Sequence, residues 1–154
     1  MANVSRINGF KPVKHLNGSP YNGQANLYFV PSSNNDVIMV GDVVKLAGNS
    51  RSPTGAPTVA RHAGGATEAA VGVVVGILFS GVGDTQNMPP VTDLNTPVYR
   101  RASTDRYLLV ADAVDLIFEA QTSGATFISD DVGANCEVDV TAGSTTSGAS
   151  GPIS

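Results

Sequence analysis

The first 35 residues lack acidic side chains, although the chain of 154 residues carries 13 aspartates and glutamates. Three basic residues, Arg6, Lys11 and Lys14, give this stretch a net charge of +3. Residues 36–101 are neutral, and residues 102–154 carry eight acids against one base, a net charge of −7. A basic N-terminal part and an acidic C-terminal part favour contact between copies or with a charged partner. The alternative is a solvated surface on which the charge is unevenly distributed. The total charge of −4, without a basic stripe, argues against nucleic acid as the main partner.

Cysteine and long apolar runs are also scarce. The single Cys136 cannot form a disulfide within the chain, which excludes a disulfide scaffold. The longest apolar stretch, residues 69–79, has 11 residues interrupted by two glycines and is too short to span a bilayer. No apolar run of signal-peptide length precedes Leu27. We therefore expect synthesis in the cytoplasm and no membrane partner.

The scarcity of charge points to the fold class. Charged residues make up 14% of the chain, against roughly 25% in typical soluble domains. The chain has 17 glycines and 9 prolines between short runs of Val, Ile and Leu. This mixture predicts an all-β protein, a small barrel or sandwich of jelly-roll-like or tulip-like form. Residues 70–79 give the strongest strand signal, with Gly72 and Gly76 indicating a bend or a close backbone approach.

Further strands and loops follow from apolar runs and turn formers. The predicted strands are 26–30, 37–40, 43–46, 98–101, 106–111, 115–121, 125–128 and 136–140. A hairpin is predicted between residues 107–111 and 116–120, and long loops over 48–65 and 80–97.

The first 26 residues are predicted to form an extended, irregular docking arm. Turn formers recur every few residues and cannot sustain a helix or a central strand, yet apolar residues are too frequent for a disordered tail. Residues 27–140 are predicted to form a single β-rich domain, and residues 141–154, rich in Gly, Ser and Thr, a tail or long loop.

The residues that usually carry chemistry do not form a motif. Neither His15 nor His62 has metal ligands at zinc-binding spacing. The acids at 112, 115, 130 and 131 supply only part of a calcium loop, so turn-forming roles are favoured. Ser103, Asp105 and His62 could be drawn as a triad, but nothing in the sequence orients them. We expect no enzymatic activity, no metal and no cofactor.

The arm carries a resemblance to a known family. Residues 1–24, MANVSRINGFKPVKHLNGSPYNGQ, resemble the opening of the capsid decoration, or cement, proteins of tailed bacteriophages. Weaker matches follow in order, at YFVP (28–31), VGDVVK (40–45), GVVVG (72–76), YRRAST (99–104), YLLVAD (107–112), DVGAN (131–135) and AGSTT (142–146). The opening is the most specific part, and the matches cover nearly the whole chain.

The resemblance implies a structural virion protein on the capsid exterior, made in the host cytoplasm. It would bind the expanded head and reinforce contacts between major capsid subunits, as a homodimer or homotrimer. On this hypothesis the arm supplies apolar anchors and bases that pair with capsid acids: Arg6, Ile7, Phe10, Lys11, Val13, Lys14 and Tyr21.

Two alternatives stay open at the level of sequence. The arm residues could pack only against their own barrel. The chain could instead be a fibre, tail or baseplate accessory module that binds carbohydrate or a receptor. The carbohydrate alternative predicts exposed aromatic residues in the loops, but 48–65 and 80–97 contain none.

Overall fold

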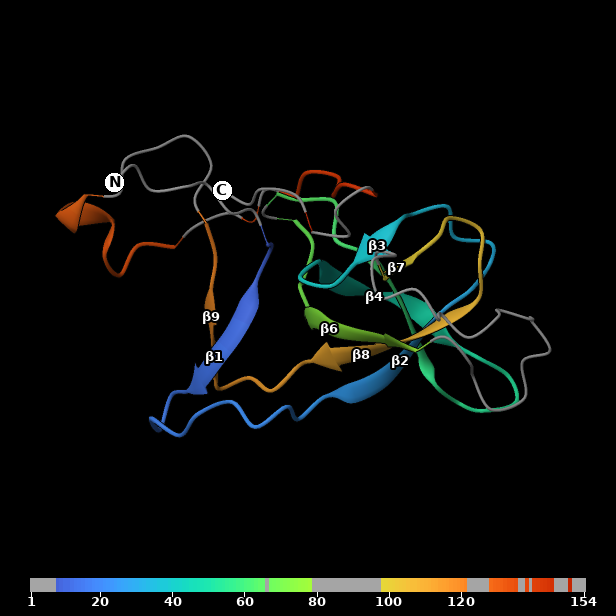
Figure 1. Ribbon diagram of the computed structural model, residues 1–154, viewed down its shortest axis with the longest axis horizontal. Helices are drawn as coiled ribbons and strands as arrows, with labels where there is room; N and C mark the ends of the chain where they lie inside the picture. The colour runs from blue at the N-terminus through green and yellow to red at the C-terminus, as the bar shows by residue number, and fades with distance from the viewer. Residues whose placement is uncertain are drawn as a thin grey trace.

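The computed structural model describes residues 8–65, 67–78, 98–121, 128–135, 138, 140–145 and 150 (Figure 1). These residues form nine strands and one short 3-10 helix. The elements are β1 (Lys11–His15), β2 (Asn26–Val30), β3 (Ile38–Met39), β4 (Val43–Ser50), β5 (Pro57–Arg61), β6 (Gly72–Leu78), β7 (Tyr99–Arg100), β8 (Arg106–Ala111), β9 (Leu116–Glu119) and η1 (Ser129–Asp131). The predicted all-β class is confirmed.

Five strands close into a barrel in the order β2-β5-β4-β6-β8. Neighbouring strands are antiparallel, except that β2 runs parallel to β5. Because the barrel is closed, its strands have no free edge for pairing with another chain. The core is formed by aliphatic side chains that are fully or almost fully buried: Val30, Ile38, Val44, Val59, Val74, Ile77, Leu108 and Val110.

Two glycines in β6 lie against β8. A Cβ on Gly72 would lie 2.4 Å from the Ala111 carbonyl oxygen, whereas a Cβ on Gly76 would lie 3.2 Å from Cδ1 of Leu109. A backbone atom cannot move aside as a side-chain end can. We therefore expect Gly72→Ala to lower the free energy of unfolding by about 2–3 kcal/mol, and Gly76→Ala by less than about 1 kcal/mol. Urea unfolding followed by circular dichroism measures both losses, and equal losses would contradict this reading.

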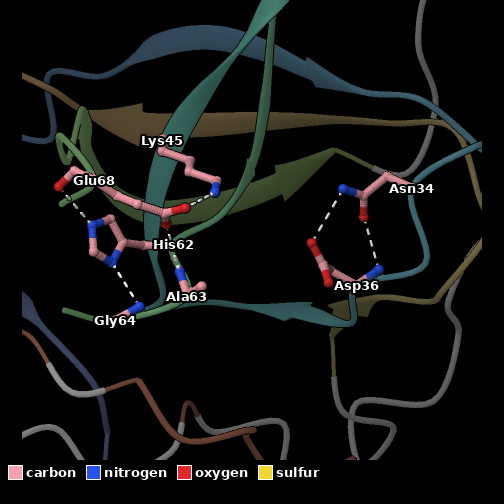
Figure 2. A network of polar contacts seen from close by, with 7 residues as sticks. All are labelled: Asn34, Asp36, Lys45, His62, Ala63, Gly64 and Glu68. Atoms are coloured by element: carbon pink, nitrogen blue, oxygen red, sulfur yellow. Dashed lines mark hydrogen bonds and ion pairs between the residues drawn. The ribbon is translucent and has the colours of Figure 1, made fainter.

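Arg100 in β7 fixes the loop between β2 and β3. Its side chain is fully buried, with 0% exposure. The guanidinium donates to the carbonyl oxygens of Pro31 (2.8 Å), Asn34 (2.8 Å), Thr104 (3.0 Å) and Asp36, and to Oδ1 of Asn34 (3.1 Å). Within the same loop the Asn34 side chain bonds the Asp36 carboxylate at 3.1 Å and accepts from the Asp36 N–H at 2.8 Å (Figure 2).

The predicted hairpin between residues 107–111 and 116–120 is wrong. Strand β8 pairs with β2 on one edge and β6 on the other, while β9 pairs with β1. Closure of the barrel therefore leaves β8 no edge for the next strand. The predicted loop over 48–65 contains the last three residues of β4 and all of β5, whose Thr58 and Val59 are buried. The predicted strands over 125–128 and 136–140 and the predicted loop over 80–97 lie mostly or wholly outside the described residues.

Candidate interaction surface

Strands β1 and β9 form a two-stranded antiparallel ribbon beside the barrel (Figure 1). The arm is therefore not irregular throughout. Pro12 is tolerated in β1 because a two-stranded ribbon has no central ladder to interrupt. Phe10, just before β1, packs edge-on against Phe118 of β9, with ring centroids 6.3 Å apart. The arm is thus fastened to a distant part of its own chain.

A register shift in β1 places two lysines on one face of the ribbon. Lys11 pairs with Glu119 and Lys14 pairs with Ile117, with the shift between the two lysines. Alternate residues of a strand point to the same side, so Glu119 and Ile117 share a face and the lysines share it with them. Val13 lies within the shift. The register therefore places both lysines on the face of the ribbon that also carries Glu119.

A hydrogen-bonded turn holds Leu16 at the end of the ribbon. The His15 N–H donates to the Ser19 carbonyl at 2.8 Å, and the Gly18 N–H donates to the His15 carbonyl at 2.9 Å. The Leu16 N–H donates to the Asp115 carbonyl at 2.8 Å, and Nδ1 of His15 lies 3.0 Å from the Asp115 carboxylate. The end of β1 and the turn before β9 are therefore joined.

Aliphatic side chains are exposed at this end of the ribbon. The exposed fractions are 42% for Val13, 72% for Leu16 and 102% for Val114. Lys11 and Lys14 are exposed as well. We call Lys11, Val13, Lys14 and Leu16 the ribbon face. Exposed aliphatic area supplies binding energy and neighbouring charges orient a partner, so this face suits an acidic protein surface with an apolar depression.

Two of the predicted contact residues are engaged within the chain. Phe10 is half-buried and packs against Phe118. Tyr21 is half-buried, donates its N–H to the Val13 carbonyl at 3.0 Å and its hydroxyl to the Gln24 carbonyl at 3.0 Å, and burial raises its pKa. For these two side chains the structure favours the alternative in which the arm packs on its own protein.

The other predicted contact residues fall into two groups. Lys11, Val13 and Lys14 are exposed, and Arg6 and Ile7 lie outside the described residues. Sequence reasoning did not select Leu16 or Val114 as contacts. The sequence signal that could have identified Leu16 is that an aliphatic residue lies within a turn, where polar residues are usual.

The root of the arm is fixed at a second place, the turn between β3 and β4. There the Phe10 N–H donates to the Gly41 carbonyl at 3.0 Å. The next residue, Asp42, is only 1% exposed and accepts from the Met39 N–H at 2.8 Å and the Ser150 hydroxyl at 2.5 Å. Burial raises the pKa of Asp42, and these two hydrogen bonds oppose the shift. Phe10 of the arm and Ser150 therefore both bond the turn formed by Gly41 and Asp42.

His62 is buried and belongs to a polar network whose other members are partly or fully exposed (Figure 2). Its Nδ1 accepts from the Gly64 N–H at 3.0 Å, so the proton lies on Nε2, which donates to the Glu68 carbonyl at 3.0 Å. The Glu68 carboxylate pairs with Lys45 and accepts from the Ala63 N–H at 3.1 Å, and the hydrogen bond from Lys45 is the main cause of its lowered pKa. The network holds the segment after β5 against β4.

The residues that could be drawn as a triad are engaged in separate places. The Ser103 hydroxyl donates to Oδ1 of Asn35 at 2.7 Å, and Asp105 accepts from the Ser32 N–H at 2.5 Å. Within the described part of the chain, no hydrogen bond joins either side chain to His62. The structure does not assemble these three groups.

The acids weighed for calcium have structural partners. Asp112 accepts from Asn26 at 3.0 Å and from the Tyr28 hydroxyl at 2.7 Å, and Asp131 accepts from the Ile128 N–H at 2.9 Å. Among the residues that the structure describes, no group of three or more His, Cys, Asp and Glu side chains could hold a metal. No helix in the described ranges is long and apolar enough to cross a membrane.

Comparisons of the chain with protein-family models, with curated proteins and with solved structures find no match. The fold and surface define an all-β protein in which a barrel carries a ribbon with an exposed basic and aliphatic face. That face and the sequence of the arm are the features that bear on its function.

Proposed function

We propose that the chain is a structural protein of a tailed-phage virion. It binds the outer surface of the expanded head and stabilises contacts between major capsid subunits. The resemblance of residues 1–24 to decoration proteins supports this proposal. The observation that carries it is the ribbon face, where the segment bearing the resemblance exposes Val13 and Leu16 beside two lysines. These side chains leave aliphatic area and charge uncovered by the protein's own fold, and a partner surface that covers them gains binding energy.

The arrangement suggests how the protein acts on the head. Phe10 and Tyr21 hold the ribbon in shape, and the ribbon face contacts the major capsid protein, together with Arg6 and Ile7. A thin shell under pressure from packed DNA gains stability from added contacts by mass action, without chemistry. Each interface is modest, but many copies act together on a symmetric lattice, with neighbouring copies paired as a homodimer or homotrimer. The proposal involves no nucleic acid, membrane or cofactor.

Co-sedimentation with phage heads tests the proposal. The purified protein is mixed with expanded heads that lack their decoration protein and, separately, with unexpanded proheads. Saturable binding to expanded heads alone is expected, at a copy number that matches the lattice. Absence of binding to either particle would refute the proposal and favour a fibre, tail or baseplate module that binds carbohydrate or a receptor.

A further inference from the structure

We infer that the contact between Asp42 and Ser150 is a latch that sets the position of the N-terminal arm. Two segments distant in sequence attach to the same turn. The Phe10 N–H donates to the Gly41 carbonyl at 3.0 Å, and the Ser150 hydroxyl donates to Oδ1 of Asp42 at 2.5 Å. The coupling concerns the fold of the free protein and does not depend on what the ribbon face binds.

The parts of the latch touch one another directly. A Cβ on Gly9 would lie 2.6 Å from Cβ of Ser150 and 2.5 Å from the Gly41 carbonyl oxygen. A Cβ on Gly41 would lie 2.4 Å from the Asn8 carbonyl oxygen. Both glycines have positive φ, +66° and +97°, which other residues rarely adopt. The arm backbone, the turn and Ser150 therefore fill one packed space, and a shift of one part alters the room for the others.

The latch depends on the buried carboxyl group of Asp42 and its hydrogen-bond donors. Asp42 and Ser150 are 1% and 3% exposed. A carboxylate removed from water needs hydrogen-bond donors, and the Met39 N–H and the Ser150 hydroxyl supply them. Departure of Ser150 would remove one donor and admit water beside Gly9. The hydrogen bond from Phe10 to Gly41 would then be exposed, at the residue that precedes β1.

Hydrogen exchange in the full-length protein tests the latch. In Ser150→Ala we expect the Phe10 amide to exchange about tenfold faster, which corresponds to the loss of one hydrogen bond. The Val74 amide of the barrel strand β6, which donates to the backbone carbonyl of Asp42, should keep its rate. Ser129→Ala is the matched control at an exposed serine. An unchanged Phe10 rate, or equal acceleration at Phe10 and Val74, would overturn the inference.

A double variant separates a latch from two independent contacts. Asp42→Asn keeps the size of the side chain but replaces the carboxyl group that Ser150 contacts by an amide, so Phe10 exchange should rise by a smaller factor, about threefold. In the Asp42→Asn background, Ser150→Ala should then accelerate Phe10 exchange by less than its tenfold effect in the parent chain. Fully multiplicative effects would show that the two side chains act separately and would refute the latch. Heads are not needed for either measurement, so the result is independent of the capsid proposal.

Discussion

Arg100→Met should lower the free energy of unfolding by more than about 4 kcal/mol, a large part of the 5–15 kcal/mol typical of a domain. Methionine fills much of the space but donates no hydrogen bond. The carbonyl groups of Pro31, Asn34, Asp36 and Thr104 would lose their buried donor. Burial lowers the pKa of Arg100, yet arginine stays charged at any ordinary pH. Urea unfolding followed by circular dichroism measures the loss.

Two further variants test the reason for this effect. Arg100→Lys keeps the charge, but an ammonium has three donors and lacks the planar fork, so a loss of about 2–3 kcal/mol is expected. Arg101→Met changes the exposed neighbour and should cost less than about 0.5 kcal/mol. If Arg100→Lys were as stable as the parent protein, charge alone would hold the loop and the fork would be unnecessary. If Arg100→Met does not fold, the lysine variant still gives the measurement.

Four of the five barrel strands were predictable because their signals are local, whereas β5 fell within the predicted loop 48–65. Residues 70–79 form a β-branched run, and β6 follows it over Gly72–Leu78 with three buried aliphatic side chains. The predicted strand 106–111 matches β8, since its apolar residues are buried on both faces. The glycines of the run also indicated a close backbone approach, which Gly72 makes to Ala111. The composition and the short apolar runs were therefore enough to predict the all-β class.

The ribbon was not predictable in the same way. Lys11 pairs with Glu119 across more than a hundred residues. Because no short turn joins the two strands, no local sequence signal indicates that they pair. The local signal at 107–120 instead favoured a hairpin, which the closure of the barrel prevents. Arg100 and Asp42 are residue types that usually lie at the surface. Their burial depends on loop carbonyls and on Ser150, partners that only the folded backbone brings together.

The combined variant Lys14→Glu/Leu16→Ser should weaken binding to expanded heads by about 100-fold or more, if the ribbon face docks on the capsid. Charge reversal replaces attraction to capsid acids by repulsion, and serine removes the most exposed aliphatic group of the ribbon face. Together these changes are worth about 3 kcal/mol. Lys11 is left unchanged because glutamate there would face Glu119 across the ribbon and disturb the fold. Co-sedimentation at increasing protein concentration measures the affinity.

The control for this variant makes the same chemical changes away from the ribbon. Arg101 is exposed and Leu46 is 57% exposed, so Arg101→Glu/Leu46→Ser reverses one charge and removes one aliphatic group elsewhere on the surface. Head binding by this control should stay within about threefold of the parent. Both variants should unfold within about 1 kcal/mol of the parent protein. Equal loss of binding in the two would mean that net charge, rather than the ribbon face, governs attachment, whereas loss in the first alone would place the contact on the ribbon face.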